Sequence, residues 1–186
     1  MSFIQIQAGV FARKRIEIPR HSAVRPTSDR VKTSLFAILE PIIEHHPFVD
    51  VFSGSGAVGF EALSRGSPHV ILIEKNPQLI QSMRANAIKL SCPPELTIIQ
   101  GCALKHLPKI RNDCPNAVFF IDPPYDSDLT EKILKILDKG IDGWAITESH
   151  HKTDLECSLN QLMPFRSERY GETRLVFWRN KAFKEI

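Results

Sequence analysis

Two stretches near the start of the chain have clear hydrophobic patterns. Residues 3–18 alternate apolar and polar positions around Gly9, which predicts a short β-hairpin. The next apolar positions are spaced as on one face of a helix: Val31, Leu35, Ile38, Leu39 and Ile42. Thr27 or Ser28 is placed to be the N-cap of this helix.

From residue 48 onward, short apolar runs alternate with segments of helical spacing. The runs occupy residues 48–52, 69–74, 96–100, 117–122 and 144–148, and the helical segments 59–66, 76–90, 128–140 and 159–163, with a short helical piece after the third run. This alternation predicts an α/β fold in which helices cover a parallel sheet. Residues 165–179 have the pattern of two strands joined at Gly171, so antiparallel pairing closes the sheet.

We therefore predict a Rossmann-like fold with a mostly parallel, seven-stranded sheet and an antiparallel C-terminal strand. It would occupy residues 27–186, and residues 1–26 would form a hairpin and basic extension. Composition agrees with one globular domain, since 42% of the 186 residues are hydrophobic and 24% are charged.

No apolar run reaches the roughly 18 residues of a membrane span, and the N-terminus lacks the pattern of a signal peptide. We expect a soluble cytoplasmic protein with no membrane contact. The four cysteines show no CxxC spacing, which favours reduced thiols and no metal site.

Positive charge is concentrated at the start of the chain. Seven basic and two acidic residues lie up to Lys32, whereas 17 basic and 19 acidic residues follow. Such asymmetry suggests a polyanion contact, nucleic acid first, because Lys and Arg near phosphates release counterions. A solvated basic face is an equally good interpretation of charge alone.

Candidate chemistry begins after the first apolar run, where ligands bind in parallel sheets. Gly54, Gly56 and Gly59 form GxGxxG, and Glu74 ends the next run twenty positions after Gly54. This matches the dinucleotide fingerprint, so NAD is a competitor. Asp50 favours another cofactor, because a carboxylate there would repel a pyrophosphate but suits a cationic amino-acid end. S-adenosylmethionine has such an end.

A second candidate site is the sequence DPPY, residues 122–125, which ends the fourth run. Asp122 and the prolines present carbonyl and carboxylate acceptors with few donors. Asp122 and the Pro123 carbonyl could each accept one N–H of an exocyclic amine and turn its lone pair toward a methyl donor. Tyr125 could stack on the base, which must be unpaired or flipped. The alternative is a proline-rich turn in which Asp122 caps the next helix.

These motifs together resemble a known family. D-x-x-x-G-x-G followed by DPPY is similar to the class I S-adenosylmethionine-dependent amino-methyltransferases. RPTSDRVKTSLFAILEP, VDVFSGSGAVGFEALSRGS, VILIEKN and IDPPY resemble, more narrowly, the bacterial RsmD family, which methylates N2 of one guanine in 16S ribosomal RNA. The resemblance extends from Gly9 to the YGETRLVFWR ending. It implies the class I methyltransferase fold and, as partner, small-subunit RNA or the small ribosomal subunit itself. We expect a monomer, the simplest form for an enzyme that must dock on something much larger.

Carried over to this chain, the resemblance implies site residues of three kinds. The cofactor contacts are Asp50, Ser53, Gly54, Gly56 and Glu74, to which we add their neighbours Ser55 and Lys75, with Cys102 and Ala103 after the third strand. Asp122, Pro123 and Tyr125 would bind the amine, and Arg13, Lys14, Arg25 and Arg30 would hold RNA.

Two positions depart from the family pattern. Gly101-Cys102 stands where Asp or Asn often meets the adenine, and Lys32-Thr33 stands where Arg-Glu usually follows DRV. Two other functions remain open beside NAD chemistry. One is methylation of N6 of adenine in DNA or RNA, and the other is a non-catalytic, RNA-binding assembly factor.

Overall fold

The computed structural model describes residues 2–19, 27–124, 128–153 and 157–182. The strands are β1 (Ser2–Gln5), β2 (Arg15–Ile18), β3 (Phe48–Asp50), β4 (Val70–Glu74), β5 (Leu96–Gln100), β6 (Val118–Ile121), β7 (Trp144–His150), β8 (Leu162–Tyr170) and β9 (Thr173–Asn180). The helices are α1 (Asp29–Leu39), α2 (Ala57–Ser64), α3 (Pro77–Leu90), α4 (Ala103–Asp113) and α5 (Leu129–Leu137).

Seven of the strands form one sheet in the order β5-β4-β3-β6-β7-β9-β8. Neighbours from β5 to β7 are parallel, whereas β9 runs antiparallel to both β7 and β8. The predicted seven-stranded α/β sheet with antiparallel C-terminal strands is thus confirmed. Strands β1 and β2 pair separately as the predicted N-terminal hairpin.

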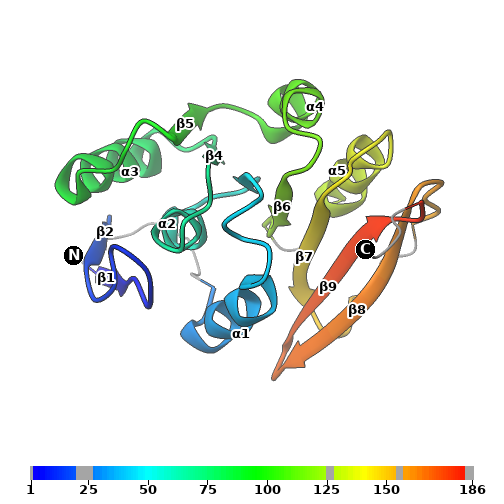
Figure 1. Cartoon of the computed structure of the whole chain (residues 1–186), viewed down its shortest axis with the longest axis horizontal. Coiled ribbons are helices and arrows are strands. Elements are labelled where there is room, and N and C mark those ends of the chain that lie inside the picture. The colour runs from blue at the N-terminus through cyan, green and yellow to red at the C-terminus, as the bar shows by residue number, and fades with distance from the viewer. Residues whose placement is uncertain (1, 20–26, 125–127, 154–156, 183–186) are drawn as a thin grey trace.

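The sheet lies between two helical layers (Figure 1). One core contains apolar residues of α1, α2 and α3 together with Phe48, Leu72 and Phe120 of the strands. The opposite core contains those of α4 and α5 with Val49 and Phe119. Successive strand residues therefore face opposite layers, which explains why the central strands are continuous apolar runs.

The helix predicted over residues 159–163 is wrong. Leu162 already belongs to β8, and the residues before it form no helix. The carboxylate of Asp138 accepts the backbone N–H groups of Asn160, Gln161 and Leu162 at 2.7–2.8 Å. Because these N–H groups donate to Asp138, the C-cap of α5, they are not used in helical hydrogen bonds. The chain instead continues directly into β8.

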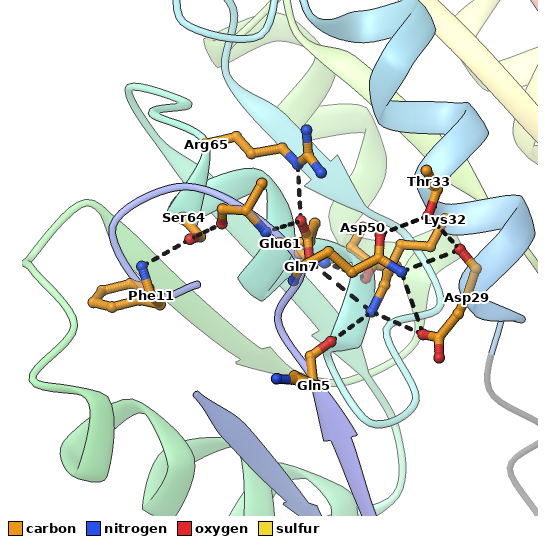
Figure 2. A network of polar contacts seen from close by, with 12 residues as sticks. Gln5, Gln7, Phe11, Asp29, Lys32, Thr33, Asp50, Glu61, Ser64 and Arg65 are labelled. Carbon is orange, nitrogen blue, oxygen red and sulfur yellow. Dashed lines mark hydrogen bonds and ion pairs between the residues drawn. The ribbon is translucent and has the colours of Figure 1, made fainter. Parts of the chain in front are cut away.

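A buried carboxylate fastens the hairpin to α2 (Figure 2). Glu61, with no exposed surface, accepts the backbone N–H groups of Gln7 at 2.8 Å and Ala8 at 3.1 Å. Its partners also include Arg65 Nε at 2.8 Å, and Lys32 Nζ lies 3.9 Å away. The segment after β1, α1 and α2 thus share one network of charges and hydrogen bonds.

Lys32 belongs to this network and not to the basic surface. Its side chain is 1% exposed, and its ammonium donates to the Gln5 carbonyl at 3.0 Å. The positive charge counted up to Lys32 therefore overstates what a polyanion can reach. The Lys32 ammonium instead compensates the buried carboxylate of Glu61. Lys32, the first residue of the Lys32-Thr33 departure, therefore has a structural role inside the protein.

All four cysteines are free thiols. No helix within the described residues is both long and apolar enough to cross a membrane.

Candidate active site

A cavity of about 660 Å³ opens where the parallel strands end. It is lined by the segments that follow β3, β4, β5 and β6, by Glu148 of β7, and by Thr27 and Ser28 before α1. Strand order reverses between β3 and β6, and such a switch point is where open α/β sheets bind ligands. Most of the residues predicted for the site meet here: Asp50, Ser53, Gly54, Ser55, Glu74, Lys75, Cys102, Ala103, Asp122 and Pro123.

The glycine loop joins β3 to α2 beneath this cavity. Gly56 is the N-cap of α2 with φ of 79°, a left-handed conformation that glycine adopts without strain. It is not among the lining residues, because it packs against α3: an added Cβ would lie 2.9 Å from Met83 Sδ. A Cβ on Gly59 would lie 2.0 Å from Leu72 Cδ2. These two glycines therefore permit close packing, and Gly54 lines the cavity.

Glu74 ends β4 at the edge of the cavity. One oxygen accepts the N–H groups of Lys75 and Asn76, both at 2.8 Å, and the other accepts that of Gly54 at 2.9 Å. A carboxylate offers about four acceptor positions, so these bonds leave room for about one more donor. To hold two ribose hydroxyls, Glu74 would have to exchange one of these backbone bonds.

Asp50 lies at the end of β3 and is 2% exposed. Its Oδ2 accepts the Gly59 N–H at 3.2 Å. Burial raises its pKa to about 7; the Gly59 hydrogen bond opposes this, and the charges of Glu74 and Glu148 add to it. This carboxylate is therefore poised to ionise near neutral pH when a cation approaches.

Asp122 directly follows β6 and faces the same cavity. Desolvation raises its pKa well above the usual range of a carboxyl, and the charges of Glu148 and then Asp50 raise it further. Pro123 lines the cavity beside it. Tyr125, predicted to stack on a base, lies outside the described residues. Asp122 and Pro123 thus line the same cavity as three other carboxyl groups, those of Asp50, Glu74 and Glu148.

Glu148 was not predicted as a site residue. It lies on β7 and lines the cavity, and its Oε2 accepts a hydrogen bond from Thr27 Oγ1 at 3.2 Å. A polar residue at the end of a buried run was the available signal, since Glu74 and Asp122 end theirs in the same way.

The wall after β5 is mainly apolar. Cys102 is the N-cap of α4 and makes no side-chain capping hydrogen bond, and its thiol is exposed. Ala103 and Leu104 follow it along the cavity. An adenine ring there would meet apolar surface and the N–H groups at the start of α4, in place of the usual carboxylate or amide.

Three of the four predicted RNA-binding residues are described, and none of these three lines the cavity. Arg13, Lys14 and Arg30 are exposed, and Arg13 occupies the turn of the hairpin with φ of 68°. Arg25 lies outside the described residues. The hairpin and the start of α1 therefore present cations to solvent, as an RNA contact would require.

Comparison with known proteins identifies the family of this chain and several relatives. The family described as Conserved hypothetical protein 95 matches residues 4–179. Ribosomal RNA small subunit methyltransferase D of Haemophilus influenzae is 33% identical over 135 residues, which cover 72% of this chain and 70% of that protein. The Bacillus subtilis protein YlbH is 30% identical over 177 residues, or 87% and 90% of the two chains.

Two solved structures share the fold. The Escherichia coli protein yhhF superposes with a TM-score of 0.83 at 24% identity, covering 98% of this chain and 100% of that one. An RNA methyltransferase from Salinibacter ruber, solved in complex with S-adenosyl-L-homocysteine, gives 0.64 at 16% identity and covers 87% and 98%. Both likenesses concern the arrangement of the backbone.

Proposed function

Because the chain belongs to the RsmD family, which includes ribosomal RNA small subunit methyltransferase D, we propose that it transfers a methyl group from S-adenosylmethionine to N2 of one guanine in 16S ribosomal RNA. The enzyme would bind that RNA or the small ribosomal subunit as its partner. It would act as a monomer in the cytoplasm. The observation that carries the proposal is the meeting of Asp50, Glu74 and Asp122-Pro123 around one cavity.

The lining residues fit this cofactor at both of its ends. Asp50 offers a buried carboxyl to the cationic amino group, and ionises more readily when that charge is near. Glu74 offers one open acceptor position to the ribose hydroxyls, and a second one if it exchanges a backbone bond such as that from Gly54. The apolar wall at Ala103 and Leu104 suits the adenine ring.

When bound, S-adenosylmethionine supplies an electrophilic methyl group on a positively charged sulfur. The acceptors of Asp122 and Pro123 hold the amine by its two N–H bonds and direct the nitrogen lone pair toward that methyl. Transfer of the methyl group would leave the electron pair of the broken C–S bond on sulfur, and the proton that the amine loses would pass to the Asp122 carboxylate and from there to water. Asp122 would also stabilise the positive charge that develops on the nitrogen, because an ionised carboxylate is aimed at the place where that charge appears.

Transfer of labelled methyl to small ribosomal subunits and to their stripped RNA, with nucleoside analysis, tests the proposal. We expect N2-methylguanosine at one site with the wild type. Asp122→Ala should lower the rate at least a hundredfold and leave cofactor binding by calorimetry nearly unchanged. The matched control is Asp142→Ala, which removes an exposed carboxylate elsewhere. Absence of label in every RNA, with cofactor still bound, would refute the proposed reaction.

A further inference from the structure

Glu148 is placed beside the residues that would hold the amine. Strands β6 and β7 are parallel neighbours, and Ile121 pairs with Thr147. The residues that follow this pair are Asp122, directly after β6, and Glu148 within β7, and both line the cavity. Since Glu148 contributes to the raised pKa of Asp122, the two carboxyl groups interact directly through their charge.

The orientation of Glu148 is fixed from another part of the chain. Thr27 donates its hydroxyl to Oε2 of Glu148 at 3.2 Å, although 121 positions separate the two residues. Thr27 stands just before Ser28, which caps α1 by accepting the Val31 N–H at 3.3 Å. The start of α1 thus positions one carboxylate oxygen at the cavity wall.

A carboxylate beside the amine-binding residues could distinguish the bases, because they differ in the ring nitrogen next to the exocyclic amine. In guanine, the amine at N2 is flanked by N1, which carries a hydrogen. In adenine and cytosine, the ring nitrogen next to the amine is an acceptor without hydrogen. An ionised carboxylate only accepts hydrogen bonds, so it pairs with guanine N1–H and repels the lone pair of the other two bases.

We propose that Glu148 selects guanine by accepting its N1–H while Asp122 and the Pro123 carbonyl hold the N2 amine. The inference rests on the proposed function and adds to it the group that distinguishes the base. DPPY alone accepts any exocyclic amine, so the acceptor on the adjacent strand supplies the discrimination. Thr27 is a positioning residue in this scheme, because it acts through Glu148.

2-Aminopurine provides a direct test, because it has the amine of guanine but no hydrogen on N1. The target guanine is first mapped by nucleoside analysis, and an RNA fragment is then prepared with guanine or 2-aminopurine at that position. Single-turnover methyl transfer is measured for wild type, Glu148→Gln, Thr27→Val and the exposed control Glu95→Gln. We expect wild type and control to prefer guanine at least tenfold, because 2-aminopurine leaves the Glu148 carboxylate without its hydrogen bond from N1–H.

Glu148→Gln should lose most of that preference, since its amide can donate to the bare N1 of 2-aminopurine. Thr27→Val should give an intermediate preference. A damaged fold would lower transfer to both RNAs equally, so the ratio isolates recognition of N1. Equal transfer to both RNAs by the wild type, or an unchanged ratio in Glu148→Gln, would overturn the role of Glu148 and leave the reaction standing. Failure of the wild type to methylate any guanine would overturn both proposals.

Discussion

Replacing Asp50 with Asn should stabilise the ligand-free protein at neutral and alkaline pH. Asn has nearly the same shape and keeps an acceptor for the Gly59 N–H, but it carries no charge. In the wild type, the buried carboxyl must ionise in a desolvated position between Glu74 and Glu148, and its pKa is raised to about 7. The variant removes that cost from the native state.

The pH dependence follows from the direction of this shift. Below about pH 4 the carboxyl is protonated in native and unfolded chains alike, and it costs nothing. Between that pH and about 7, only the unfolded chain loses the proton, so the free energy of unfolding of the wild type falls. Raising a pKa from 3.8 to about 7 corresponds to roughly 4 kcal/mol in full. The advantage of the variant should therefore grow by about 2–3 kcal/mol between pH 5 and pH 8.

Urea unfolding at pH 5, 6, 7 and 8 without ligand measures this difference. The exposed Asp142→Asn serves as control and should follow the wild type at every pH. Calorimetry should show the opposite effect on S-adenosylmethionine, whose affinity for Asp50→Asn should fall at least tenfold because the carboxylate partner of its amino group is lost. Parallel stability curves for wild type and Asp50→Asn would refute the reasoning, since the carboxyl would then ionise without penalty in the native state.

Three further outcomes are expected. Glu61→Ala should lower the free energy of unfolding by about 3–5 kcal/mol in urea, because the buried ammonium of Lys32 loses one of its carboxylate neighbours and the Gln7 and Ala8 N–H groups lose their acceptor; a loss below 1 kcal/mol would contradict the network. Glu74→Ala should weaken S-adenosylmethionine binding, and an unchanged dissociation constant would remove Glu74 from the cofactor site. Neutralising Arg13, Lys14 and Arg15 together should weaken RNA binding and flatten its dependence on salt, whereas equal salt slopes would exclude the hairpin from the interface.

The sequence predicts those features that depend on local patterns. The buried runs 69–74 and 117–122 each end in a carboxylate, and this pattern places Glu74 and Asp122 at one edge of the sheet. Asp50 was recognised by its spacing from the glycines that follow it. Local patterning failed at residues 159–163, whose leucines and glutamine suit a helix. There the distant carboxylate of Asp138 bonds to the backbone, and no nearby residue signals it.

Contacts that depend on the order of the strands could not be predicted from the sequence. Glu148 lies beside Asp122 only because β6 and β7 are neighbours in register. Its hydrogen bond with Thr27 joins two distant parts of the chain. Lys32 was counted as part of a basic segment, since no neighbouring residue in the sequence indicates that its side chain is buried near Glu61. Long-range pairs of this kind need the folded topology.

The strand order also determines how the site is completed during translation. Strand β3 pairs on one side with β4 and on the other with β6, which ends at residue 121. At synthesis rates of about 5–20 residues per second, β6 follows β3 by roughly 4–14 s. The network around Glu61 joins residues that all lie among the first 65, so it can form within that interval. The glycine loop and Glu74 therefore emerge before Asp122 and Glu148, so the residues proposed for the cofactor are all synthesised before the carboxylates proposed to hold the base.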